Sequence, residues 1–207
     1  MKMRTLTMTL IITLAIWIAA APLLTGCGDE PVSDSNTNSV ENVRRDLTGA
    51  NSVSMKTIRT AVVEILGENY WPDKQLTREE LETETGITEE MYDDYLAEKQ
   101  NIETDIDTMI IIKAKQEYLS EIETKLNDYR ESLMIKYRDR PQELGKVEAS
   151  RIEIIDTYIC FVQLGADTNE AAEAGDEKVI ALCQQENERA VDIIEKTIFD
   201  ALIHSDS

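Results

Sequence analysis

Histidine is almost absent from this chain of 207 residues: the one copy, His204, lies near the end of the last predicted helix. A zinc site needs His or Cys ligands at set spacings, and Ser-His-Asp or Cys-His catalysis needs an imidazole. The sequence also contains no Gly-x-Ser-x-Gly, Ser-x-x-Lys or glycine-rich phosphate-binding motif. It therefore predicts no metal, no cofactor and no catalytic residues of these kinds.

Basic residues are also scarce, with 21 Lys and Arg against 41 Asp and Glu and a net charge of -20. Nucleic acid phosphates and anionic lipid headgroups repel so acidic a body, so neither is an expected direct partner. A strongly solvated surface explains this charge, and attraction to cations or to a basic partner is the alternative.

Carboxylates leave one catalytic chemistry open, because a hydrolase that uses a carboxylate pair needs only two acids in one cleft. Asp105 and Asp107, on one face of a predicted strand, are the first pair to consider, with plain solvation as the alternative. The acids between residues 79 and 94 fall around helix caps and first turns, where the helix dipole favours negative charge. The sequence leaves enzymatic activity undecided and favours a protein without one.

Aromatic residues and cysteines are few. Trp71 is the only tryptophan outside the N-terminal apolar segment, and with Tyr70 it forms either a stacking patch for sugar or peptide or a cap on the core. An oxidising compartment would permit Cys160 and Cys183 to form a disulfide, and separate burial of the two thiols is the alternative.

The one specific motif is Leu24-Thr25-Gly26-Cys27, which follows basic Lys2 and Arg4 and an apolar run that begins near Leu6. This order resembles the lipobox of bacterial lipoproteins, which implies cleavage before Cys27 and attachment of acyl chains, such as palmitate, to its thiol. An uncleaved transmembrane anchor is the alternative, since about 19 apolar residues can span a bilayer. Both interpretations place the remaining chain on the extracytoplasmic face of the cell membrane.

The sequence divides into three parts. Residues 1–26 are predicted to be a lipoprotein signal peptide and 27–51 a flexible, polar and acidic tether. Residues 52–207 are predicted to form a single α+β domain, since the roughly 180 residues that remain after the signal suffice for one core and are too few for two large ones.

Periodicity predicts the elements of that domain. Helices are expected at 55–66 and 117–137, together with a last helix interrupted near Gly175, and Thr77 and Glu80 form a capping box that starts one of two short helices joined by Gly86. Strands are expected at 106–113 and 95–100, and a hairpin at 151–155 and 158–164. We expect an antiparallel sheet of three or four strands with helices packed mainly on one face, including both the 117–137 helix and the C-terminal helix.

Several of these features occur together in a known family. Gly86-Ile87, the strand Ile110 to Ala114, a helix ending at Tyr137 before Pro141, Glu148-Ala149 and a hairpin that carries Tyr158 follow one another in the chain. This combination resembles a domain-of-unknown-function family found on small bacterial lipoproteins, mostly Gram-positive, over roughly residues 55 to 203. The resemblance implies a fold and a setting, but neither an activity nor any site residues.

The hypothesis from the sequence is a non-enzymatic, lipid-anchored module that binds a protein or another component of the cell envelope. An envelope hydrolase with paired carboxylates is one alternative. A small solute-binding lipoprotein is another, although a single compact domain has no second lobe to close on a ligand.

Overall fold

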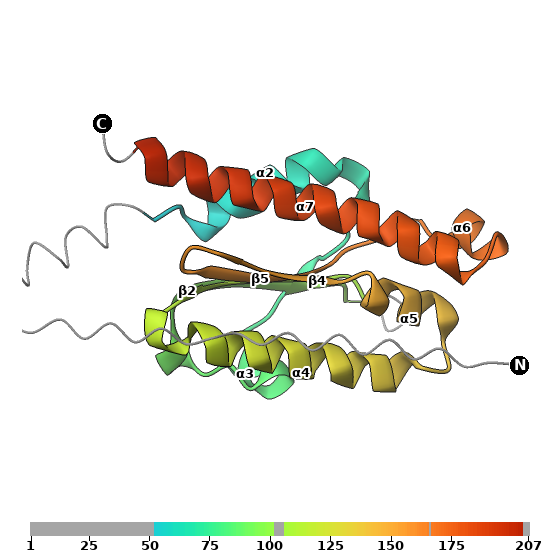
Figure 1. Cartoon of the computed structure of the whole chain (residues 1–207), viewed down its shortest axis with the longest axis horizontal. Coiled ribbons are helices and arrows are strands. Elements are labelled where there is room, and N and C mark those ends of the chain that lie inside the picture. The colour runs from blue at the N-terminus through green and yellow to red at the C-terminus, as the bar shows by residue number, and fades with distance from the viewer. Residues whose placement is uncertain (1–51, 102–105, 166, 205–207) are drawn as a thin grey trace, which may run out of the picture.

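The computed structural model describes residues 52–101, 106–165 and 167–204. In it a five-stranded antiparallel sheet, ordered β1-β2-β3-β5-β4, lies between two layers of helices (Figure 1). The strands are β1 (Lys74–Gln75), β2 (Tyr92–Lys99), β3 (Thr108–Ala114), β4 (Arg151–Ile155) and β5 (Tyr158–Gln163). The α+β class is confirmed, but the sheet has five strands rather than three or four. The predicted signal peptide, lipobox and tether lie outside the described residues.

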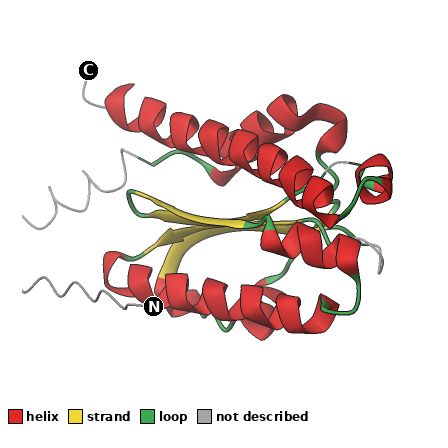
Figure 2. Cartoon of the chain, turned by 45° about the vertical axis from the view of Figure 1, so that its right-hand side comes forward, coloured by secondary structure: helices red, strands yellow, loops and turns green. Residues whose placement is uncertain are grey.

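Helices cover both faces of the sheet, as Figure 2 shows from a second direction. The described residues form six α-helices: α2 (Met55–Leu66), α3 (Arg78–Thr85), α4 (Leu119–Tyr137), α5 (Pro141–Glu148), α6 (Asn169–Glu173) and α7 (Asp176–His204). α3 and α4 pack on one face, and α2 and α7 pack on the other. The prediction that α4 and α7 share a face is therefore wrong.

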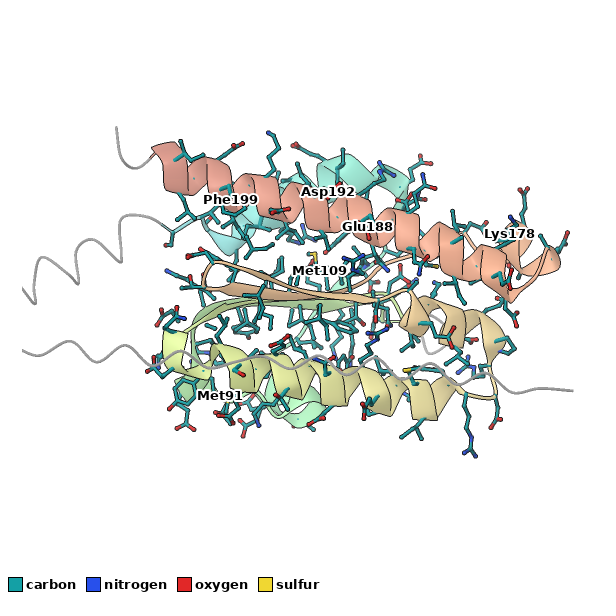
Figure 3. All side chains as sticks on the ribbon, in the orientation of Figure 1. Met91, Met109, Lys178, Glu188, Asp192 and Phe199 are labelled. Carbon is teal, nitrogen blue, oxygen red and sulfur yellow. The ribbon has the colours of Figure 1, made fainter. Side chains whose placement is uncertain are left out.

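The central strands explain the second layer of helices. In β3, Ile110 and Ile112 belong to the core under α4, whereas Met109 and Ile111 belong to the core under α7. Figure 3 shows Met109 between the sheet and α7. All four side chains are completely buried. A sheet that is apolar on both faces is shielded from water only when helices cover both.

The N-terminal helices begin and end at the predicted residues. The Ser54 side chain caps α2, which stops at Gly67, and the Thr77–Glu80 capping box starts α3. Gly86 ends α3 with a φ of 73°, in the left-handed region that glycine adopts without strain. The second short helix expected after Gly86 is only a 3₁₀ turn, Glu89–Met91, that leads into β2.

Pro141 does not simply end the helical region, as the sequence suggested. It occupies the first turn of α5, where the missing N–H of proline has no intrahelical partner to lose. α5 was not predicted. It carries Lys146, whose buried side chain lies beside Asp107 at the start of β3.

The β4–β5 hairpin is confirmed, with Ile155 opposite Tyr158. Its turn lacks glycine, and Asp156 takes the positive φ of 55° instead. The structure does not join Cys160 to Cys183. The two thiols are buried in different apolar clusters, and burial raises the pKa of the Cys160 thiol to about 12, which makes it unreactive.

Candidate functional site

A buried ion pair lies where β3 begins. Lys146 Nζ on α5 is 2.9 Å from Asp107 Oδ1, and the side chains of Lys146 and Asp107 are 6% and 0% exposed. The backbone N–H of Gly165 donates to Asp107 Oδ2 at 2.9 Å. Both carboxylate oxygens of Asp107 are thus engaged by the protein itself. The other half of the predicted carboxylate pair, Asp105, lies outside the described residues.

Trp71 belongs to the same corner of the fold. Its indole N–H donates to the backbone oxygen of Glu68 at 2.7 Å, and Lys146 Nζ lies 5.1 Å from the centre of its ring. One ring thus covers a buried cation of the protein. Trp71 is half-buried and is not among the residues of the apolar clusters, so the choice between a core cap and a stacking patch stays a prediction.

A cleft of about 780 Å³ lies between the C-terminal half of α4 and the ends of β2, β3 and β5. We call it the α4 cleft. Its lining includes three amides and four hydroxyls, which are Gln100, Asn101, Gln163, Thr108, Tyr129, Ser132 and Tyr137. Three lysines, Lys74, Lys99 and Lys136, also line it.

Two buried amide oxygens in this cleft accept no hydrogen bond from any described residue. Gln163 is 1% exposed, and its Nε2 donates to the backbone oxygen of Ile106 at 2.6 Å, which fixes the orientation of the amide. Among the residues that the structure describes, none donates to Gln163 Oε1 or to Gln100 Oε1. Leaving a buried acceptor without a donor costs about 1–3 kcal/mol, so both oxygens favour a molecule that brings donors into the cleft.

The lysines give this cleft a charge opposite to that of the whole protein. Lys74 Nζ lies 2.6 Å from Glu80 Oε1, and Lys99 pairs with Glu84. Lys136 is exposed and forms no ion pair with any described residue, and its Nζ lies 5.0 Å from the centre of the Tyr137 ring. Glu84 is the one acid among the described lining residues, against three lysines. Lys136 is therefore the one lining lysine without a carboxylate partner among the described residues.

Tyr129 supplies a fixed hydroxyl within the cleft. Its ring packs edge-on against Phe161 in the core, with 5.4 Å between ring centres. Burial, and secondarily the charge of Glu84, raises the pKa of Tyr129. The phenol therefore keeps its proton throughout the physiological range.

Tyr70 is a second, half-buried phenol, and it packs against the apolar cluster on the opposite side of the sheet. Its hydroxyl donates to Glu98, and Arg59 Nε donates to both oxygens of that carboxylate at 2.7 and 2.8 Å. Burial, followed by the hydrogen bond to Glu98, raises the pKa of Tyr70. This network fastens α2 to β2.

These two tyrosines predict alkaline instability. In the unfolded chain a tyrosine loses its proton near pH 10, whereas folded Tyr70 and Tyr129 retain theirs, so above this pH the unfolded state binds fewer protons. Their contribution to stability is complete below about pH 10. Above this pH the free energy of unfolding should fall by up to about 1.4 kcal/mol per pH unit for each tyrosine. Urea unfolding at pH 8 to 11.5 measures this slope. Tyr129→Phe should make it shallower, and an unchanged slope would contradict the assignment.

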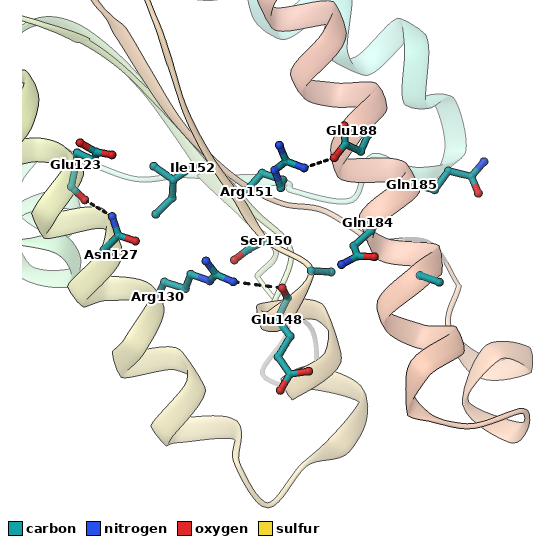
Figure 4. Close-up of a pocket in the computed structure, with 12 residues that line it drawn as sticks. Glu123, Asn127, Arg130, Glu148, Ser150, Arg151, Ile152, Gln184, Gln185 and Glu188 are labelled. Atoms are coloured by element: carbon teal, nitrogen blue, oxygen red, sulfur yellow. Dashed lines mark hydrogen bonds and ion pairs between the residues drawn. The ribbon is translucent and has the colours of Figure 1, made fainter. Parts of the chain in front are cut away.

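A second groove, of about 710 Å³, lies beside the edge strand β4 between α4 and α7 (Figure 4). Its polar groups are largely satisfied within the protein. Arg151 pairs with both Glu153 and Glu188, and the guanidinium of Arg130 donates to the backbone oxygen of Glu148 at 3.3 Å. One buried atom here, Arg130 Nε, lacks a partner among the described residues. The α4 cleft has two such atoms and an excess of cations, so it is the better candidate.

Sequence reasoning did not identify the residues of the α4 cleft. Gln163 closes an otherwise apolar strand, and a polar residue at the end of a buried run was the one available signal. The described residues contain no cluster of three or more His, Cys, Asp or Glu side chains placed to hold a metal ion. Nor does any helix within residues 52–101, 106–165 and 167–204 have an apolar stretch of membrane-spanning length.

The fold and the cleft describe an α+β domain with a polar cavity under one helix. Comparison with protein families finds a domain of unknown function (DUF4358) at residues 66–164, from the end of α2 to the residue after β5. The resemblance to a domain-of-unknown-function family is confirmed over this range, which is narrower than 55 to 203. Comparisons with curated proteins and with solved structures find no match.

Proposed function

We propose that this protein is a lipid-anchored, extracytoplasmic binding module of the cell envelope that holds its ligand in the α4 cleft and does not catalyse a reaction. The anchor rests on Leu24-Thr25-Gly26-Cys27. The observation that carries the binding role is the pair of buried amide oxygens, of Gln100 and Gln163, that have no donor in the described part of the chain. The two acyl chains of a diacylglyceryl group on Cys27 would hold the domain at the membrane stably, whereas a single acyl chain would not.

The alternatives have less support. A hydrolase needs two carboxylates facing a substrate, and Asp107 instead faces Lys146 and the N–H of Gly165. Glu84, the acid that lines the α4 cleft, is paired with Lys99. A solute-binding lipoprotein that closes two lobes on its ligand would need a second lobe, and the described residues share a single sheet.

Replacing the sulfur of Cys27 by oxygen tests the anchor. In cells supplied with labelled palmitate, the wild-type protein should take up label and sediment with membranes, and Cys27→Ser should take up none. Cys160→Ala, which removes a buried thiol, serves as the control and should label like the wild type. A wild-type protein without label would overturn the proposal, and sedimentation of both proteins without label would indicate an uncleaved transmembrane anchor.

A further inference from the structure

Given that the α4 cleft is a ligand site, as proposed above, we infer that its ligand carries several hydroxyl groups and an anionic group in one molecule, as a sugar acid does. The inference rests on how hydrogen-bond acceptors and positive charges are distributed between the depth and the rim of the cleft.

The depth of the cleft offers acceptors. Gln163 Oε1 and Gln100 Oε1 are buried, and no donor within residues 52–101, 106–165 and 167–204 reaches them. Ser132 is exposed and its Oγ donates its proton to the backbone oxygen of Tyr129 at 2.6 Å, so it adds an acceptor at the opening of the cleft rather than in its depth. A wall of acceptors binds a donor-rich molecule, and hydroxyl groups supply donors without the desolvation cost of a cation.

The rim of the cleft offers positive charge. Lys136 is exposed, and Lys74 and Lys99 are half-buried. The two half-buried lysines already have carboxylate partners, whereas Lys136 has none among the described residues. An anionic group at the rim would therefore meet Lys136 first.

The two features exclude simpler ligands. A small inorganic anion or a carboxylate without hydroxyl groups brings no protons to Gln100 and Gln163. A neutral sugar leaves Lys136 without a counter-charge. A cavity of about 780 Å³ is large enough for a molecule that satisfies both ends, since ligand sites range over about 300–1,000 Å³.

Three probes test the two requirements separately: D-glucuronate, D-glucose and acetate. The lipidated full-length protein, labelled with ¹⁵N, is held in micelles of a zwitterionic detergent without a sugar headgroup. Glucuronate should shift the amide resonances of Asn101 and Ile106 in a saturable manner, with an affinity at least about tenfold higher than that of glucose or acetate. Lys136→Met should weaken glucuronate at least about fivefold and leave the glucose titration unchanged.

Two further variants separate binding from folding. Gln163→Leu should weaken both glucuronate and glucose, because it removes the acceptor for their hydroxyls, and its spectrum shows directly whether the domain is folded. Lys56→Met, which removes an exposed lysine from α2 on the opposite face, should bind like the wild type. Should Gln163→Leu fail to fold, the Lys136→Met comparison still decides the result.

The outcomes distinguish the inference from the proposed function. Glucose or acetate binding as tightly as glucuronate, or glucuronate binding unaffected by Lys136→Met, would overturn the inference and leave the cleft a binding site. If none of the probes shifts resonances of the cleft, the inference fails together with the binding role of the cleft. The palmitate experiment would still report on the anchor.

Discussion

Replacing Lys146 by methionine is expected to lower the free energy of unfolding by about 3–5 kcal/mol, because it removes the positive charge that lies 2.9 Å from the buried carboxylate of Asp107. The Asp107 side chain is completely buried, and its distance to Lys146 Nζ is 2.9 Å. Methionine fills nearly the same volume as the lysine stem, so packing changes little. Urea unfolding at pH 7 measures the loss.

The double variant Asp107→Asn with Lys146→Met separates charge from packing. It removes both charges, and the amide oxygen still accepts from the N–H of Gly165. We expect it to be more stable than Lys146→Met alone, with a coupling of about 1–3 kcal/mol between the two positions. Additive losses would show that the pair is not the source of the effect.

A surface pair of the same type is the matched control. Lys196 Nζ lies 3.2 Å from Asp200 Oδ2 on α7, and the two side chains are 70% and 55% exposed. Lys196→Met should change the free energy of unfolding by no more than about 0.5 kcal/mol, because water screens an exposed pair.

Local patterns in the sequence predicted the elements better than their arrangement. The isoleucines of β3 and the helical spacing of α4 specify which side chains are buried, and both elements lie where expected. The same pattern does not specify which face of the sheet a helix covers, because α4 and α7 each present one apolar stripe that fits either face. β1 has two residues, too few to show any periodicity.

The residues of the α4 cleft could not be predicted from the sequence for a related reason. The α4 cleft brings together Gln100, which follows β2, Lys136 on α4 and Gln163 at the end of β5. They meet because the antiparallel pairing places the end of β2 beside the start of β3 and the end of β5. The Asp107–Lys146 pair is likewise separated by 39 positions. No short sequence motif indicates contacts between residues this far apart in the chain. The sequence indicated Asp107 as half of a possible catalytic carboxylate pair. In the fold its carboxylate instead pairs with Lys146 and accepts from the N–H of Gly165.

Replacing Asn187 by leucine is expected to lower the free energy of unfolding by about 2–5 kcal/mol. Asn187 on α7 is completely buried and bridges two backbone groups. Its Oδ1 accepts from the N–H of Leu164 at 2.7 Å, and its Nδ2 donates to the oxygen of Ala149 at 2.9 Å. Leucine has a similar size and can make neither bond, so each buried backbone group loses its partner at about 1–3 kcal/mol.

Hydrogen exchange locates that loss. The amide of Leu164, just beyond the end of β5, should exchange faster in Asn187→Leu than in the wild type by more than the global destabilisation explains, because Asn187 is its direct acceptor. Gln185→Leu, an exposed substitution of similar size on the same helix, should leave both stability and the exchange of Leu164 nearly unchanged. If Asn187→Leu costs less than about 1 kcal/mol, the two backbone groups find other partners and α7 is not fastened to the end of the sheet through this side chain.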